Sequence, residues 1–121
     1  KKNRAIQTKL EKVISYTKQT MVAYMSEEDL NRLCTYVAEY SSGDTLQKIT
    51  PVKVDSQLKS IDIMHFGWNI GKAFGIKRIH TATFIKNVFA HTLRDLEIST
   101  IERKMSHTES ECYIKLQQLK E

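Results

Sequence analysis

The sequence of 121 residues predicts a mainly α-helical fold. Apolar residues recur at spacings of three and four along most of the chain, which is the pattern of amphipathic helices. The chain holds a single Pro, and 40% of its residues are hydrophobic while 27% are charged. This composition is typical of an ordinary globular domain rich in helix formers and long enough to bury a core. We therefore expect one compact domain built from helices.

Residues 1–44 are expected to form a helical hairpin. A first helix is predicted over residues 5–25, where apolar residues follow the i, i+3, i+4 rule. Ser26, followed by three acidic residues, indicates the cap and first turn of a second helix. The run from Ser41 to Asp44 is expected to end this helix. Two such helices pack as an antiparallel pair.

Residues 45–57 are expected to be an extended linker. Pro51 excludes a helix through the middle of the segment, and the partial alternation around it makes Val52–Val54 a candidate edge strand. The linker separates the hairpin from a C-terminal unit over residues 58–121, within one compact domain overall.

The stretch 60–75 is predicted to be the central helix. It holds the only Trp, two of the four Phe and three of the four Gly, and apolar residues fall on most of its sides. Its first residue, a serine, together with Asp62, is typical of a helix start, and Gly75 is typical of a left-handed stop. Gly67, Gly71 and Gly75 stand four apart, so they share one side and let a neighbouring backbone approach closely.

Two shorter helices are expected after a basic turn over residues 75–80. Thr81 is a good cap for a helix over 82–92, in which the apolar side chains face the core. A few-residue connection at Leu93–Asp95 leads to a second short helix over 96–105, where apolar residues are spaced by three and four.

Positive charge is concentrated in two blocks. The net charge is +5, and residues 1–18 and residues 71–94 each carry a net +5, whereas the rest of the chain is mildly acidic. Two such blocks are what an anionic partner, most commonly nucleic acid, requires. Solvated helix faces and a basic terminus explain the same charge, so both interpretations stay open.

No residue pattern predicts catalysis, a cofactor or a metal site. The segment Gly67–Lys72 has three residues between its glycines where a phosphate loop needs four, and Ala73 stands where that loop needs a hydroxyl. The histidines and cysteines show no ligand spacing, and His65 is expected to be a core histidine that donates to a backbone carbonyl. Cys34 and Cys112 stand among apolar neighbours, so we expect two reduced, buried thiols and no enzyme.

Nothing in the sequence predicts association with a membrane. No apolar run approaches the roughly 20 residues of a membrane span. The basic start is not followed by the apolar region of a signal peptide. We therefore expect a cytoplasmic protein.

The order of elements in the C-terminal half is typical of a helix-turn-helix with a wing. Cys112–Leu116 is either a short strand, which would be the wing, or the opening of a terminal helix. In such a module the second paired helix enters the major groove of DNA, and residues around it hold phosphates. The residues expected at the groove are Ser99, Thr100, Arg103 and Lys104, and those expected on the DNA backbone are Lys72, Lys77, Arg78, Lys86 and Arg94. Two acids on the same helix, Glu97 and Glu102, count against this hypothesis, and a plain helical bundle has the same helix order.

Three segments resemble uncharacterised proteins from mobile elements of Bacteroides-type bacteria. They are His65–Ile70, Phe84–Phe89 and Arg94–Ile101, and the similarity spans roughly residues 26–116. This resemblance implies no established function. In helix order, the C-terminal half also resembles the winged-helix end of the RteC regulators of conjugative transposons, which implies DNA binding.

Two hypotheses about function follow. The first is a module that binds double-stranded DNA and regulates or assists a mobile element; the basic block 71–94 and Arg103–Lys104 would converge on one face. The second is a protein interaction or oligomerisation domain without nucleic-acid binding, in which the N-terminal helices pair with a partner or form a homodimer. An exposed apolar strip on Ile6–Met25 would mark the second hypothesis.

Overall fold

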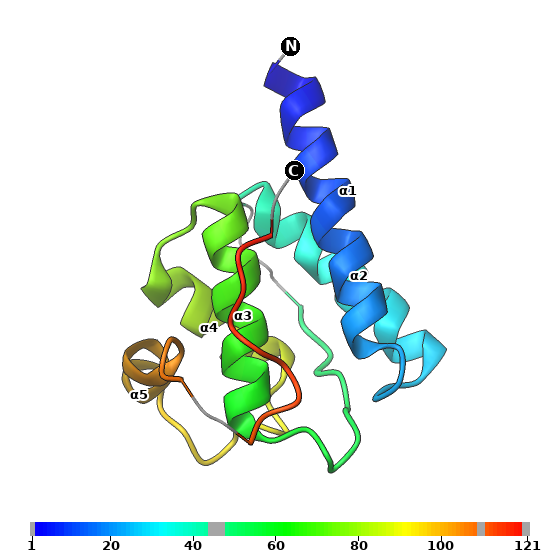
Figure 1. Cartoon of the computed structure of the whole chain (residues 1–121). Helices are drawn as coiled ribbons and strands as arrows, with labels where there is room; N and C mark the ends of the chain where they lie inside the picture. The colour runs from blue at the N-terminus through cyan, green and yellow to red at the C-terminus, as the bar shows by residue number, and fades with distance from the viewer. Residues whose placement is uncertain (1, 44–47, 109–110, 120–121) are drawn as a thin grey trace.

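The computed structural model of the chain describes residues 2–43, 48–108 and 111–119, with side chains from residue 7 onward. Within these ranges it contains five helices and no β-strand (Figure 1). The helices are α1 (Lys2–Met21), α2 (Glu27–Ser41), α3 (Ser60–Phe74), α4 (Arg78–Val88) and α5 (Ile98–Lys104). The prediction of a mainly α-helical fold is therefore confirmed.

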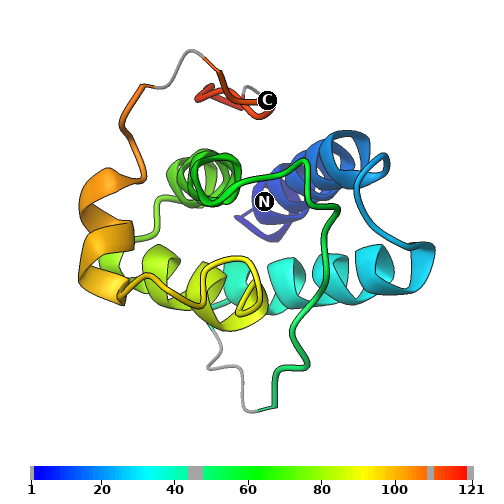
Figure 2. The same cartoon turned by 90° about the horizontal axis from the view of Figure 1, so that it is seen from below.

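Helices α1 and α2 form the predicted antiparallel hairpin (Figures 1 and 2). The hydroxyl of Ser26 caps α2, because it accepts a hydrogen bond from the N–H of Asp29 at 3.1 Å. Helix α1 ends at Met21 rather than at residue 25, since the chain turns there and the N–H of Tyr24 donates to the Met21 carbonyl at 2.9 Å. Val22 continues the apolar spacing but is 62% exposed. The apolar pattern therefore runs past the end of the helix.

The end of α2 lies where the sequence predicts it. The helix ends at Ser41, and the N–H of Gly43, which has a φ of 82°, donates to the Tyr40 carbonyl at 3.1 Å. Asp44 and the first linker residues, 45–47, lie outside the described ranges.

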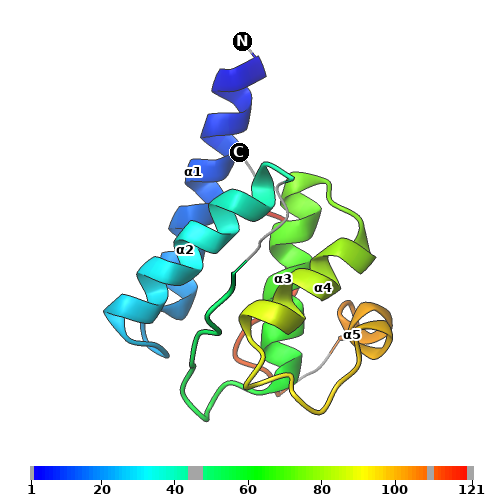
Figure 3. The ribbon, with the colours of Figure 1, turned by 180° about the vertical axis from the view of Figure 1, so that it is seen from behind.

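The second half of the linker packs between the hairpin and the C-terminal helices (Figure 3). Val52 is buried, and its N–H donates to the carbonyl of Val88, the last residue of α4, at 2.9 Å. From α2, the guanidinium of Arg32 donates to the carbonyl of Pro51 at 3.0 Å. These backbone groups pair with helices, so the expected edge strand at Val52–Val54 does not form.

Helix α3 is the central helix, as predicted, and it lies between α1 and α5 in Figure 2. Three of its apolar side chains, Ile63, Phe66 and Ile70, are completely buried. The cap residue is Lys59 rather than the expected serine; its N–H donates to the carboxylate of Asp62 at 2.9 Å. The helix ends at Phe74 and is capped by Gly75, whose left-handed φ of 70° is the conformation that glycine adopts without strain.

Gly67 and Gly71 are the contact surface of α3 for α4, as their spacing predicts. A Cβ atom at Gly67 would lie 2.9 Å from two carbons of Ile85, and one at Gly71 would lie 2.5 Å from the hydroxyl oxygen of Thr81. Gly75 has open space around it and serves only as the stop. The two helices therefore pack at a distance that side chains at these positions would prevent.

Thr81 is not the cap of α4, and this expectation is wrong. The helix begins three residues earlier, at Arg78, and Thr81 is buried inside it, with its hydroxyl bonded to that of Tyr40. Burial raises the pKa of Tyr40 to about 12, against a smaller lowering by this hydrogen bond. Helix α4 also ends early, so the connection to α5 covers residues 89–97 instead of the few residues expected.

The last described segment, residues 111–119, is neither a strand nor a helix; we call it the C-terminal strap. It follows α3 as an extended chain (Figure 1). Cys112 and Ile114 are buried, whereas Tyr113 and Lys115 between and after them are exposed. Neither of the two interpretations of this segment is correct, and no wing strand is present in the part of the chain that the structure describes.

Asp62 and His65 of α3 bind the backbone of the strap. One carboxylate oxygen of Asp62 accepts the N–H groups of Tyr113, at 2.6 Å, and Ile114, at 3.0 Å. The His65 ring lies between two carbonyl oxygens, that of Ile114 at 2.8 Å from Nδ1 and that of His107 at 2.6 Å from Nε2. The prediction of a core histidine paired with a backbone carbonyl is confirmed.

Asn69 continues this row one turn further along α3. Its amide nitrogen donates to the carbonyl of Lys115 at 2.9 Å and to the hydroxyl of Tyr16 in α1 at 2.7 Å. Its amide oxygen accepts the N–H of Gln117 at 2.8 Å. The Tyr16 ring stacks on Phe66 with ring centroids 5.9 Å apart, and burial raises the pKa of Tyr16. Asn69 thus joins three segments: α1, α3 and the strap.

Replacing Gly71 with Ala should destabilise the protein, although Ala is ordinarily the better helix former by roughly 1 kcal/mol. The added methyl group would meet Thr81 and the Tyr40 hydroxyl. We expect the free energy of unfolding, measured in urea, to fall by about 1–3 kcal/mol. The control Asn87→Ala, at an exposed position of α4, should stay within about 0.5 kcal/mol of the original. An unchanged or raised stability of Gly71→Ala would contradict the close packing of α3 and α4.

Replacing Asp62 with Ala should be among the most destabilising changes in the chain. Its side chain is 1% exposed and accepts three backbone N–H groups, all of which would lose their partner, that of Ile114 in a buried position. We expect a loss of about 3 kcal/mol or more in the free energy of unfolding. The free energy of unfolding should fall less in Asp62→Asn, which keeps one acceptor oxygen. It should hardly change in the exposed control Asp95→Ala. Equal stability of the two alanine variants would contradict this role of Asp62.

Candidate nucleic-acid interface

Arg78 joins the start of α4 to the end of α5. Its guanidinium donates to the hydroxyl of Ser106 at 2.9 Å and to the carbonyls of Glu102, at 2.5 Å, and Arg103, at 3.5 Å. The last carbonyls of a helix lack partners within the helix, and a cation near them also complements the helix dipole. The contact therefore fixes the corner at which the two helices meet.

Four basic residues converge at this corner, which we call the basic corner. They are Lys77, Arg78, Arg103 and Lys104, and all four are exposed. The acidic group nearest in sequence is that of Glu102, which is half-buried. These four residues are among those that the DNA-binding hypothesis expects on one face.

The other two candidates on the helix-turn-helix segment lie at the opposite end of α4. Lys86 is half-buried, and its ammonium donates to the carbonyls of Leu93, at 2.8 Å, and Arg94, at 3.2 Å. Lys86 therefore holds the connection between α4 and α5. Arg94 is exposed, with its Nε 4.0 Å from the carboxylate of the adjacent Asp95. The structure does not bring these two residues to the basic corner.

The four candidates on α5 form two adjacent rows. Ser99 and Arg103 are four residues apart, as are Thr100 and Lys104, so each pair shares a side of the helix. Three of these side chains are exposed and Thr100 is half-buried. Helix α5 has seven residues rather than the ten expected over 96–105, and it offers this exposed side over two turns.

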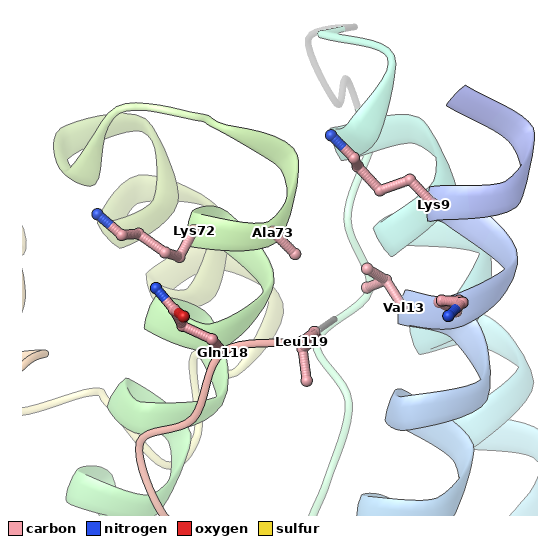
Figure 4. A pocket seen from close by; sticks show the side chains of 7 residues that line it. Lys9, Val13, Lys72, Ala73, Gln118 and Leu119 are labelled. Atoms are coloured by element: carbon pink, nitrogen blue, oxygen red, sulfur yellow. The ribbon is translucent and has the colours of Figure 1, made fainter. Parts of the chain in front are cut away.

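Lys72 belongs to a different site, near the end of α3, and in Figure 4 its ammonium points away from α1. It lines a cleft of about 300 Å³ with Lys9 and Lys12 of α1, and we call this the basic cleft (Figure 4). The remaining lining residues are Val13, Ala73, Gln118 and Leu119. The Lys72 ammonium lies 5.9 Å from the centroid of the Trp68 ring, within the range of a cation–π contact. Because α1 and α5 lie on opposite sides of α3 (Figure 2), the cleft and the basic corner are separate.

Sequence reasoning did not identify Lys9 and Lys12 as site residues. They belong to the basic block 1–18, and their spacing of three places them on one side of α1. That signal identifies a basic side of a helix, but the partner, Lys72, stands 60 positions along the chain from Lys12. Only the fold brings the two helices together.

Neither Cys34 nor Cys112 forms a disulfide; Cys112 is buried and Cys34 is half-buried. The Cys112 sulfur lies 3.6 Å from Nδ1 of His65, and burial raises the pKa of Cys34. Among the residues that the structure describes, no three His, Cys, Asp or Glu side chains are grouped so that they could hold a metal ion.

Over the described ranges, no helix is both long enough and apolar enough to cross a membrane. Comparisons of the chain with protein-family models, with curated proteins and with solved structures found no match.

Proposed function

We propose that the chain is a non-enzymatic module that binds double-stranded DNA through the basic corner. The observation that carries this proposal is the contact of Arg78 with the last carbonyls of α5, which places Lys77, Arg103 and Lys104 around one exposed corner. Lysine and arginine side chains clustered on one face are the electrostatic requirement for contact with successive phosphates.

The proposed contacts with DNA are of two kinds, to the sugar-phosphate backbone and to the base edges. Lys77 and Lys104 would lie on the sugar-phosphate backbone, because an ammonium is a compact charge that suits phosphate. Ser99 and Arg103 share a side of α5 and would reach base edges, if α5 lies in the major groove as the second helix of a helix-turn-helix does. The Arg78 guanidinium is already bonded to α5, so its part is to position the corner.

The finer form of the proposal is a variant of the helix-turn-helix. The connection of residues 89–97 is longer than the three- or four-residue turn of the common motif, and no wing strand is present in the described ranges. The helix order and the exposed side of α5 support this form. The sequence resemblance to mobile-element proteins supports a role as a regulator or accessory protein of such an element.

The alternative proposal is a helical interaction or oligomerisation domain that uses the N-terminal helices. Its mark is an exposed apolar strip on Ile6–Met25. Among the described side chains of residues 7–25, Val22 is the only large apolar one that is exposed, and Val13 and Met21 are buried. The basic corner therefore supports DNA binding better than α1 supports pairing.

Fluorescence anisotropy of a labelled random-sequence duplex tests the proposal. We expect binding that weakens steeply between two salt concentrations, because phosphate contacts release counterions. Lys77→Ala with Lys104→Ala should weaken binding about tenfold at low salt and lower the slope of log K against log salt by about two. The matched control, Lys18→Ala with Lys53→Ala, removes the same charge at exposed positions elsewhere and should bind like the original protein.

Two results would overturn DNA binding at the basic corner. The first is an absence of binding at micromolar protein in low salt. The second is an equal loss of DNA affinity in both double variants, which would show that binding depends only on the net charge of the protein.

A further inference from the structure

We propose that the His65 ring is a buried proton-binding site, and that its second proton fastens both the strap and the turn after α5 to α3. The stability of the fold then depends on pH near neutrality. The inference concerns the protein alone, so it holds or fails independently of DNA binding at the basic corner.

Both nitrogens of the His65 ring face backbone carbonyl oxygens. Nδ1 lies 2.8 Å from the carbonyl oxygen of Ile114 in the strap, and Nε2 lies 2.6 Å from that of His107 in the turn after α5. A carbonyl oxygen accepts hydrogen bonds and donates none, whereas a neutral imidazole carries a proton on only one nitrogen. Both bonds therefore form only when the ring is a charged imidazolium.

Burial makes the second proton necessary. His65 is 1% exposed, so water does not replace a missing hydrogen bond there. A neutral ring would place a nitrogen lone pair against a carbonyl oxygen in the interior, at the cost of an unpaired buried polar group. Both distances are at the short end for N–H···O hydrogen bonds, as is typical of bonds from a charged donor.

Asp62 supplies the opposite charge. It stands one turn before His65 on the same side of α3, and its carboxylate accepts the N–H of Ile114 at 3.0 Å, while the carbonyl of Ile114 faces the His65 ring. A nearby carboxylate favours the charged form of an imidazole and so opposes the effect of burial, which favours the neutral form. One residue of the strap thus joins a buried cation to a buried anion.

The other ionisable groups around the ring come from the end of α5 and from the strap. The Cys112 thiol is buried, with its sulfur 3.6 Å from Nδ1, and it is a weaker hydrogen-bonding partner than the carbonyl at 2.8 Å. The remaining charged and titratable residues from position 103 onward are exposed, so water screens their charges. Within the described ranges these are Arg103, Lys104, His107, Glu111, Tyr113 and Lys115.

Loss of the second proton should release the turn after α5 rather than the strap. Other side chains of α3 also bind the strap, so a neutral ring would keep its one N–H for the strap and lose its bond with His107. The N–H of His107 donates to the carbonyl of Lys104, the last residue of α5, at 3.0 Å, and the adjacent Ser106 is bonded to Arg78. The proton therefore stabilises the turn that ends at the corner between α4 and α5.

Long-range ¹H–¹⁵N correlation spectra of the imidazole rings test the proposal directly, because protonated and unprotonated ring nitrogens resonate far apart. At about pH 7.5 an exposed histidine is mostly neutral, so His91 serves as the internal reference. We expect both nitrogens of His65 to carry protons at this pH. A His65 spectrum like that of His91, with one unprotonated nitrogen, would overturn the proposal.

Urea unfolding at several pH values gives a second measurement. A histidine in the unfolded chain loses its second proton at about pH 6.5, whereas the folded protein keeps that of His65 above this pH. The stabilisation is therefore complete below this pH and is lost as the pH rises. Between about pH 7 and pH 8 we expect the unfolding equilibrium constant of the original protein to rise by up to about tenfold, the limit for one proton.

The variant His65→Gln removes the titrating ring and retains an amide donor, so this rise should disappear. The matched control His91→Gln, at an exposed position, should keep the pH dependence of the original protein. Equal pH dependence of the original protein and of His65→Gln would contradict proton binding at His65. If His65→Gln does not fold, the ring nitrogens of the original protein decide the question.

Discussion

The structure depends on one row of buried polar side chains along α3. Asp62, His65 and Asn69 are spaced by three and four residues, so they share a side of the helix, and each is bonded to the backbone of a segment far along the chain. Burying such groups is unfavourable unless their hydrogen bonds are made. Among the described residues, no buried side-chain nitrogen or oxygen lacks a partner, so the row stabilises the fold instead of weakening it.

Another side of α3 determines where α4 and α5 lie. Gly67 and Gly71 let α4 pack closely, and the position of α4 brings Arg78 to the end of α5. The polar row holds the strap, which supplies one wall of the basic cleft. The basic corner and the basic cleft are therefore both consequences of how one helix packs on its different sides.

Much of this architecture is predictable from local patterns. The apolar spacing gives the hairpin, Ser26 gives the start of α2, and the composition of the stretch 60–75 identifies the central helix and its Gly75 stop. The predictions fail where one local residue pattern fits two different structures. Thr81 has the side chain of a typical helix cap, so the start of α4 was predicted at that residue. In the structure it is the fourth residue of the helix, and its hydroxyl is hydrogen-bonded to that of Tyr40 across the core.

The strap and the basic cleft could not be predicted because their partners are distant in sequence. The bonds between Asp62 or Asn69 and the strap join residues 46 to 52 positions apart, and an extended segment bound by its backbone leaves no periodic signal in its side chains. The sequence also could not show which of the candidate DNA-binding residues lie together in the fold. Charge and helix order selected nine of them, but contacts decide that Lys86 holds a loop and that Lys72 belongs to another site.

Native-state hydrogen exchange tests the central role of the polar row most directly. The amides to follow are those of Ile114 and Gln117, which donate to Asp62 and Asn69. If α3 holds the strap as part of the core, these amides should exchange only through global unfolding, with the same free energy as amides of α3 itself. Exchange at the rate of an unstructured peptide would contradict this account, because the strap would then be separate from the cooperative fold.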